Sequence, residues 1–335
     1  MRSRFHPLTT IGLLLALLTP AAFAIHQPQA GVFLLFLAYG FALLEFQKYT
    51  SNFQFVMILV CGTAMGISLD LLYGHWPWLT VGLSLAASAT IVRQVFMPWF
   101  TYIDKLWLDT SKAAGACFCY GMAIHDTPFI WDLWLLPVLP LLFALGLTFS
   151  YVQDARNMKK RTRSGYRVRI GGPAPDFELR DQAGDPVKLS DYKGKHPVLL
   201  IFVRGDWCPG CHMMLRTYER NRAEFMEKGI HVLGIGPDDI SVNKDMVERI
   251  GVHYSMLSDD KQEVSSQYGV VYSNPLLELS VDYTEGIPLP ASFLVDINGI
   301  VRYASRPDRV GEFLDPELIF NVLNDIPAVG EVAWN

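Results

Sequence analysis

The chain has 335 residues, enough for two domains, and a formal net charge of −5. Hydrophobic residues make up 51% of it and the mean hydropathy is +0.22, which is too apolar for an ordinary soluble enzyme. The acidic balance, without a basic face, argues against nucleic acid as a partner. Scattered cysteines exclude a disulfide-stapled secreted scaffold; they are Cys61, Cys117, Cys119, Cys208 and Cys211.

The first half of the chain reads as a membrane domain. Its strong apolar runs are 10–25, 31–47, 53–73, 77–98 and 129–151. Each is near the ~20 residues that a membrane-spanning helix needs. A sixth run, 111–126, is shorter and rich in small residues, so it is either a span or an interfacial or re-entrant segment. We therefore predict an all-α membrane bundle of five or six spans over residues 1–151, with the lipid bilayer as its partner.

Lysine and arginine fall on alternate connections between these runs. The connections 26–30, 74–76 and 125–128 carry none, whereas seven lie between Arg156 and Arg169. The positive-inside rule then places both ends of a six-span bundle in the cytoplasm. We predict a multi-pass inner-membrane protein with a cytoplasmic C-terminal half. Five spans would place that half in the periplasm.

Some features of the membrane half allow two interpretations. The first run fits either a span or a cleaved signal peptide, because two arginines precede it and Ala22–Ala24 forms an A-x-A site. Asp70 and Arg93 lie toward the ends of runs and should face either the bundle or the headgroups, and snorkelling to the headgroups is the preferred interpretation. Cys117 and Cys119 are either small hydrophobic residues of the bundle or a second redox pair.

The second half has the balance of a globular domain. Residues 152–170 are predicted to be a basic linker and residues 171–335 a folded domain. The apolar run Val198–Val203 predicts a buried strand, and Met213–Lys228 has the pattern of an amphipathic helix. A second strand is expected at Ile230–Ile235.

The stretch Trp207-Cys208-Pro209-Gly210-Cys211 lies between that first strand and the helix. Pro209 suits the first helical position, which places Cys208 at the helix N-terminus, where the dipole favours a thiolate. Cys211 follows one turn later on the same face, so the two sulfurs can form a disulfide. On that face His212 would point away. A zinc site is the alternative, but no second C-x-x-C and no H-x₃₋₅-H completes it. We predict a redox pair without metal or other cofactor.

Two longer stretches carry a family resemblance. They are PAPDFELRDQAGDPVKLSDYKGKHPVLLIFVRGDWCPGC, which ends at Cys211, and PASFLVD, which begins at Pro290 and precedes an Asn298-Gly299 hairpin turn. Over about residues 170–325 the chain resembles the alkyl hydroperoxide reductase/thiol-specific antioxidant, or peroxiredoxin-like, branch of the thioredoxin superfamily. The resemblance implies an α/β thioredoxin-like domain, with a central mixed sheet flanked by helices.

The resemblance also implies site residues. Cys208 would attack and Cys211 would resolve. Trp207, Pro209, Leu289 and Pro290 would shape the substrate groove, with a cis Leu289–Pro290 bond beside the cysteines. Arg204 would support the thiolate or the transition state; Arg306 and Arg309 are further candidate arginines.

The chain departs from the family at positions that matter for mechanism. Gly205 and Ile201 stand where typical peroxiredoxins carry a Thr or Ser and a Pro. Phe202 stands where thioredoxins carry a buried Asp that accepts a proton. The site therefore matches neither pattern fully.

We predict a membrane-anchored thiol–disulfide oxidoreductase that uses the Cys208–Cys211 pair on protein disulfides. A dithiol such as a thioredoxin-like protein would reduce the pair again. One alternative is a peroxiredoxin-like peroxidase, with Cys208 peroxidatic and Cys211 resolving. An alternative of another class is a non-enzymatic redox sensor or membrane assembly factor.

Overall fold

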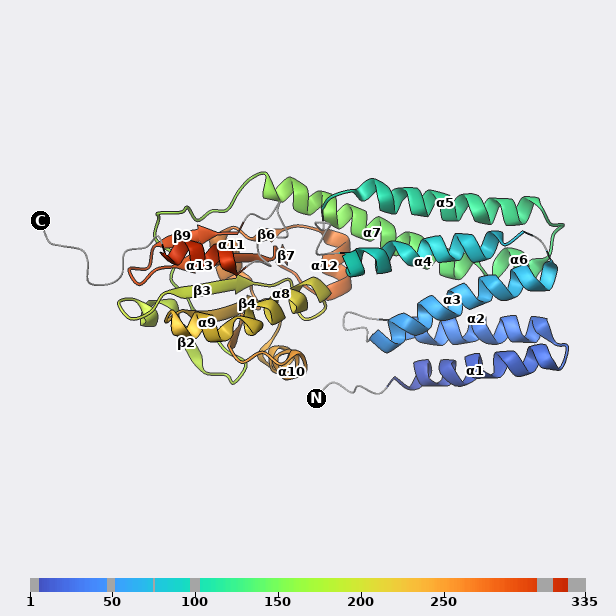
Figure 1. Cartoon of the computed structure of the whole chain (residues 1–335), viewed down its shortest axis with the longest axis horizontal. Coiled ribbons are helices and arrows are strands. Elements are labelled where there is room, and N and C mark those ends of the chain that lie inside the picture. Colours follow the sequence, from blue (N-terminus) through green and yellow to red (C-terminus); the bar gives the residue numbers. More distant parts are fainter. Residues whose placement is uncertain (1–5, 47–51, 75, 97–102, 306–315, 325–335) are drawn as a thin grey trace, which may run out of the picture. The chain divides into compact units, whose positions relative to one another are not determined.

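The computed structural model of the chain describes residues 6–46, 52–74, 76–96, 103–305 and 316–324 (Figure 1). The described residues divide into two compact units. The first contains helices α1 to α6 and helix α7 as far as Asp154, and the second begins at Ala155. In the described ranges the first unit is helical, and every strand belongs to the second.

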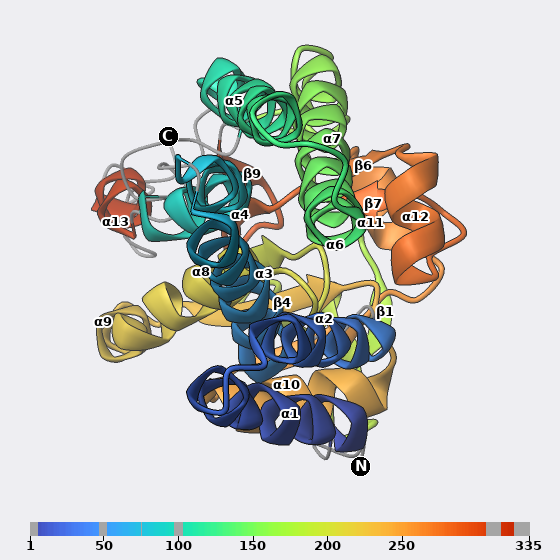
Figure 2. The same cartoon turned by 90° about the vertical axis from the view of Figure 1, so that its right-hand side faces the viewer.

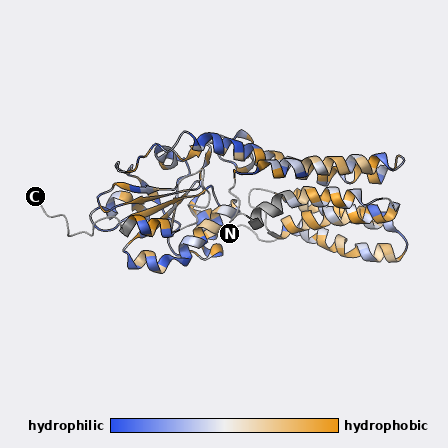
Figure 3. Ribbon diagram, turned by 45° about the horizontal axis from the view of Figure 1, so that its top comes forward, coloured by the Kyte–Doolittle hydropathy of each residue, from blue (hydrophilic) through white to orange (hydrophobic). Residues whose placement is uncertain are grey.

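Helices form in every region where the sequence has an apolar run. They are α1 Pro7–Ala24, α2 Pro28–Leu44, α3 Asn52–Tyr73, α4 Trp78–Phe96, α5 Leu106–His125, α6 Trp131–Leu135 and α7 Val138–Thr162. Among the residues that the structure describes, three stretches are long and apolar enough to cross a membrane: Pro7–Ala24, Phe53–Tyr73 and Trp131–Thr162. Figure 3 shows hydrophobic residues along these helices. The predicted helices are confirmed, whereas the number of spans stays a prediction.

The carboxylate of Asp70 faces the helix bundle, one of the two environments expected for it. Asp70 is 6% exposed and accepts hydrogen bonds from the backbone N–H of Leu79 (3.3 Å) and of Thr80 (2.7 Å). The hydroxyl of Thr80 donates a third, over 2.6 Å. The first N–H groups of a helix have no partner within it, so a carboxylate from α3 satisfies those of α4.

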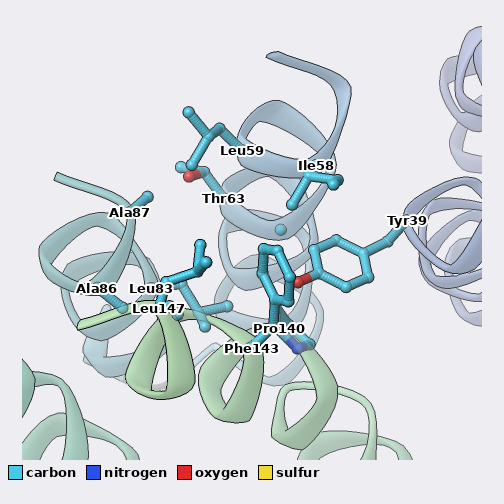
Figure 4. Close-up of a pocket in the computed structure, with 12 residues that line it drawn as sticks. Tyr39, Ile58, Leu59, Thr63, Leu83, Ala86, Ala87, Pro140, Phe143 and Leu147 are labelled. Atoms are coloured by element: carbon cyan, nitrogen blue, oxygen red, sulfur yellow. The ribbon is translucent and has the colours of Figure 1, made fainter. Parts of the chain in front are cut away.

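The helices of the first unit pack in neighbouring pairs, with α1 beside α2 and α4 beside α5 (Figure 2). A cavity of about 30 Å³ lies among α2, α3, α4 and α7 (Figure 4). The buried hydroxyl of Tyr39 has no hydrogen-bond partner, and its ring and the apolar side chains of the other helices line this space. The packed helices therefore leave a small cavity beside the Tyr39 hydroxyl.

The second unit is built on a seven-stranded mixed sheet. Its strands are β1 Glu178–Arg180, β2 Pro186–Lys188, β3 Val198–Phe202, β4 His231–Gly236, β5 Ser255–Ser258, β8 Ala291–Val295 and β9 Val301–Ala304, in the order β2-β1-β5-β4-β3-β8-β9. The central strands β3, β4 and β5 are parallel, and β8 pairs antiparallel with β3. A separate hairpin pairs β6 Val271–Tyr272 with β7 Ile287–Pro288. This is the thioredoxin-like fold that the resemblance implied.

The two faces of β3 pack against different helices. Leu199 and Ile201 join the core formed with α8 Pro209–Arg220, α9 Arg222–Glu227, α10 Ile240–Ile250 and α13 Glu317–Asn324. Phe202 contacts Tyr268 of α11 Glu263–Tyr268 on the opposite face. Every residue of β3 is buried, as expected of a central strand covered on both sides. This strand ends at the turn that carries the cysteines.

The predicted basic linker is helical as far as Thr162, because α7 continues through it. Its last turn carries Lys159, Lys160 and Arg161, which complement the negative end of the helix dipole. The guanidinium of Arg161 donates to the backbone oxygens of Val271 (3.0 Å) and Gly269. This end of α7, which belongs to the second unit, is therefore held against the β6 region of the same unit.

Candidate active site

The turn after β3 places Cys208 at the start of α8. Cys208 is the N-cap residue, with extended backbone (φ −96°, ψ 105°), and Pro209 is the first helical residue. The N–H of Cys208 donates to Gly205 O (3.2 Å), which closes the turn. Cys208 O accepts from the N–H groups of Cys211 (3.0 Å) and His212 (3.2 Å). The helix start predicted from the sequence is confirmed.

The two cysteine sulfurs lie 2.9 Å apart as free thiols. Both residues are buried, Cys208 at 8% exposure and Cys211 at 1%. The thiol of Cys211 donates to Cys208 Sγ, and this bond, opposed by burial and assisted by Arg204, lowers the pKa of Cys208 to about 6. Burial raises the pKa of Cys211 well above its usual value. The pair therefore consists of one thiolate near neutral pH and one thiol.

Arg204 supplies the positive charge beside this pair. Its backbone N–H donates to Cys211 Sγ (3.3 Å), and its guanidinium donates to the hydroxyl of Tyr272 (2.7 Å). The guanidinium carbon also lies 4.8 Å from the centre of the Trp207 ring, a cation–π geometry. The side chain is buried and held from several sides. Arg306 and Arg309 lie outside the described residues.

His212 contacts the turn that carries Cys208, because its Nε2 lies 2.9 Å from Asp206 Oδ1. Its direction relative to the two sulfurs stays a prediction. Arg249 of α10 binds the same carboxylate oxygen. Burial raises the pKa of Asp206, but the hydrogen bond from His212 and the charge of Arg249 outweigh it, and the pKa is lowered. Asp206, on the turn that carries Cys208, therefore fixes the position of the His212 ring.

Asp238 links two further groups to the cysteine turn. Its Oδ2 accepts from the backbone N–H of Asp206 (2.6 Å), and its Oδ1 accepts from the hydroxyl of Tyr283 (2.8 Å). Asp238 follows β4, the parallel neighbour of β3, and the carboxyl ends of parallel strands lie at the same sheet edge. From this rule, Asp238 could have been predicted to lie near the cysteine turn. Tyr283 has no local sequence signal.

The structure departs from the resemblance at the residues that were predicted to shape the substrate groove. No cis peptide bond occurs among the residues that the structure describes, so the Leu289–Pro290 bond is trans and the predicted cis proline is wrong. The N–H of Leu289 donates to Val270 O, and the chain runs extended from β7 into β8. A trans bond continues that extended path and is the intrinsically favoured isomer. Leu289 is buried, Pro290 is half-buried and Pro209 is exposed.

The donor set offers little to a metal ion. In the part of the chain that the structure describes, no group of three or more His, Cys, Asp or Glu side chains is arranged to hold one.

Comparisons with known proteins place this domain. A model of the AhpC/TSA family matches residues 170–304. The putative chloroplastic peroxiredoxin Q of Oryza sativa subsp. indica is 31% identical over 137 residues, 41% of this chain and 58% of that protein. The chloroplastic peroxiredoxin Q of Sedum lineare is 29% identical over 160 residues, 47% of this chain and 81% of that protein. The crystal structure of peroxidoxin BcpB from Mycobacterium tuberculosis is 24% identical with a TM-score of 0.42, over 48% of this chain and 99% of that one.

These relatives are named as peroxiredoxins and not as disulfide oxidoreductases. They support the peroxidase alternative better than the disulfide exchange that the sequence analysis placed first. The chain spans only 58% of the length of the rice protein. The family resemblance read from the sequence is confirmed. Residues 170–304 therefore form a peroxiredoxin-like domain of the AhpC/TSA family.

Proposed function

We propose that the peroxiredoxin-like domain reduces hydroperoxides, with Cys208 as the peroxidatic and Cys211 as the resolving cysteine. The observation that carries the proposal is the sulfur pair at the start of α8, 2.9 Å apart, of which Cys208 has the lowered pKa. A thiolate is the nucleophile in such chemistry. The guanidinium of Arg204 stabilises negative charge as it moves from sulfur to the leaving oxygen.

The reaction balances with the groups present and one external dithiol. The Cys208 thiolate attacks the hydroxyl oxygen of ROOH; an S–O bond forms, the O–O bond breaks, and the alkoxide takes a proton from solvent to leave as ROH. Cys211 then attacks the sulfenic acid, which forms the disulfide and releases water. A dithiol reduces the disulfide by exchange and is itself oxidised to a disulfide. We propose a thioredoxin-like protein as this reductant.

A rapid-mixing experiment on the full-length chain in detergent tests the peroxidase. Wild-type protein should consume hydrogen peroxide far faster than free cysteine does at the same pH, and Cys208→Ser should abolish this. In Cys211→Ser, a sulfenic acid should accumulate at Cys208 and be trapped by dimedone. A wild-type rate equal to that of free cysteine would refute the peroxidase.

Thiol–disulfide exchange remains the second candidate because of one observation. Cys211 lies on the first turn of α8 in contact with Cys208. Its thiol can therefore attack a mixed disulfide at Cys208 as readily as a sulfenic acid, and either attack forms the Cys208–Cys211 disulfide. Reduction of a model protein disulfide, measured beside peroxide consumption, separates the two. Fast exchange with slow peroxide reduction would favour the second candidate.

We also propose that the chain is anchored in the inner membrane with the peroxiredoxin-like domain in the cytoplasm. The three long apolar helices support membrane association, and the basic residues from Arg156 to Arg169 support the cytoplasmic side. A membrane-impermeant maleimide, applied to intact cells that carry Cys61, Cys117 and Cys119 as Ala, tests the side. Labelling of Cys208 from outside would refute the placement.

A further inference from the structure

One residue of the β6–β7 hairpin contacts the charged group beside the cysteine pair. Tyr272 of β6 is buried, and its hydroxyl accepts a hydrogen bond from Arg204 Nη2 over 2.7 Å. The guanidinium carbon of Arg204 also lies 5.9 Å from the centre of the Tyr272 ring. The charge of Arg204 is one of the causes that lower the pKa of Cys208. Tyr272 therefore holds a guanidinium whose position affects the thiolate.

The hairpin that carries Tyr272 is not part of the main sheet. β6 and β7 flank α12 Pro275–Val281 and form a two-stranded sheet, separate from the seven-stranded one. A pair of strands is only marginally stable by itself. On the β7 side, Gln262 Nε2 donates to Gly286 O over 2.7 Å. The position of Tyr272 therefore also depends on what binds the β6 side.

The end of α7 binds the β6 side. Arg161 Nε donates to Val271 O over 3.0 Å, and Arg161 Nη2 donates to Gly269 O. Further along, the N–H of Arg167 donates to Tyr268 O over 3.1 Å. A Cβ at Gly269 would lie 2.5 Å from Arg167 N, so this glycine lets the segment that leaves α7 lie directly against the chain before β6. All these residues belong to the second unit.

We propose that Arg161 is a positioning residue that, by binding the backbone of β6, sets the place of Tyr272 and so of Arg204 beside Cys208. The carbonyl group that Arg161 binds belongs to the peptide unit between Val271 and Tyr272. A peptide unit is planar, so fixing its oxygen also fixes the nitrogen of Tyr272. The guanidinium presents its donors in a rigid fork, which suits it to hold two carbonyl groups at once.

This inference goes beyond the proposed peroxidase, since it applies to either reaction of the cysteine pair. It assigns the last turn of α7 a part in setting the reactivity of Cys208. The same turn ends a stretch that is long and apolar enough to cross a membrane.

The test is the pH dependence of Cys208 alkylation by iodoacetamide in the full-length chain in detergent. Arg161→Met removes the fork, and Tyr272→Phe removes only the hydroxyl. In both variants Arg204 is held less closely beside the pair, so the pKa of Cys208 should rise. Alkylation below the midpoint should slow by about threefold and should converge with wild type at high pH. The double variant should match Tyr272→Phe alone, because Arg161 acts through that hydroxyl.

The matched control is Lys160→Met, which removes a positive charge from the same turn of α7 and leaves the two bonds of Arg161 in place. Its midpoint should equal that of wild type, and a shift as large as in Arg161→Met would overturn the inference. A wild-type midpoint in Arg161→Met or in Tyr272→Phe would also overturn it. So would losses that multiply to about ninefold in the double variant, which would show that the two residues act independently.

A rate that falls equally at every pH would overturn the inference as well, since it marks a change in access to the sulfur and not in its pKa. None of these results depends on peroxide. Failure of the wild-type protein to consume hydrogen peroxide would refute the proposed peroxidase and leave this inference standing.

Discussion

Replacing Cys211 with alanine removes the hydrogen bond that its thiol donates to Cys208 Sγ over 2.9 Å. This bond is the largest of the influences on the pKa of Cys208, which is lowered to about 6. A hydrogen bond to a charged group contributes about 1.5 kcal/mol or more, and 1.36 kcal/mol corresponds to one pH unit. We therefore expect the midpoint of Cys208 alkylation to move upward by about one pH unit.

The assay is the rate of iodoacetamide addition to Cys208 as a function of pH, read from the peptide that carries it. Only the thiolate reacts, so the rate falls as pH drops through the pKa. At pH values well below both midpoints, Cys211→Ala should react about tenfold more slowly than wild type, and at high pH the two should converge.

The matched control is Cys211→Ser, which keeps a hydroxyl donor at the same place. Its midpoint should stay closer to wild type than that of Cys211→Ala. An unchanged midpoint in the alanine variant would show that the contact between the sulfurs does not lower the pKa. Equal shifts in both variants would show that the donor is not the cause.

Three further changes test the surroundings of the pair. Arg204→Met removes the guanidinium and should slow peroxide reduction by about 10²-fold; an unchanged rate would exclude it from the reaction. Asp206→Asn removes a carboxylate whose pKa is lowered, so its stability contribution is present above about pH 3.9 and is lost as pH falls. The free energy of unfolding of the variant at pH 7 should be lower by about 1–3 kcal/mol. The difference in melting temperature between the variant and wild type should shrink in acid, and a difference that stays the same would contradict this. Pro290→Ala should keep peroxide reduction within about twofold, since the preceding bond is trans; a large loss with normal melting would restore a groove role for Pro290.

The sequence by itself determined the features that depend on local pattern. Apolar runs of sufficient length became helices, because a helix satisfies the hydrogen bonds of its own backbone. The strand Val198–Phe202, the turn and the proline-started helix place Cys208 at an N-terminus through neighbours within a few residues. The sequence motif did not decide between the two activities, because a C-x-x-C pair can carry out either disulfide exchange or peroxide reduction. The family comparison favoured the peroxidase.

The tertiary structure alone decided which distant groups meet at that turn. Asp70 caps a helix, His212 contacts Asp206, and Leu289–Pro290 is trans; the first two follow from contacts that sequence spacing does not show. Asp238 reaches the cysteine turn because two parallel strands end at one sheet edge. Tyr283 reaches Gly205 only because the glycine has no side chain and Asp238 holds the hydroxyl there. Hydrogen bonds between such residues, some of them 32 and 45 positions apart, leave no periodic trace in a sequence, and so these partners appear only when the chain is folded.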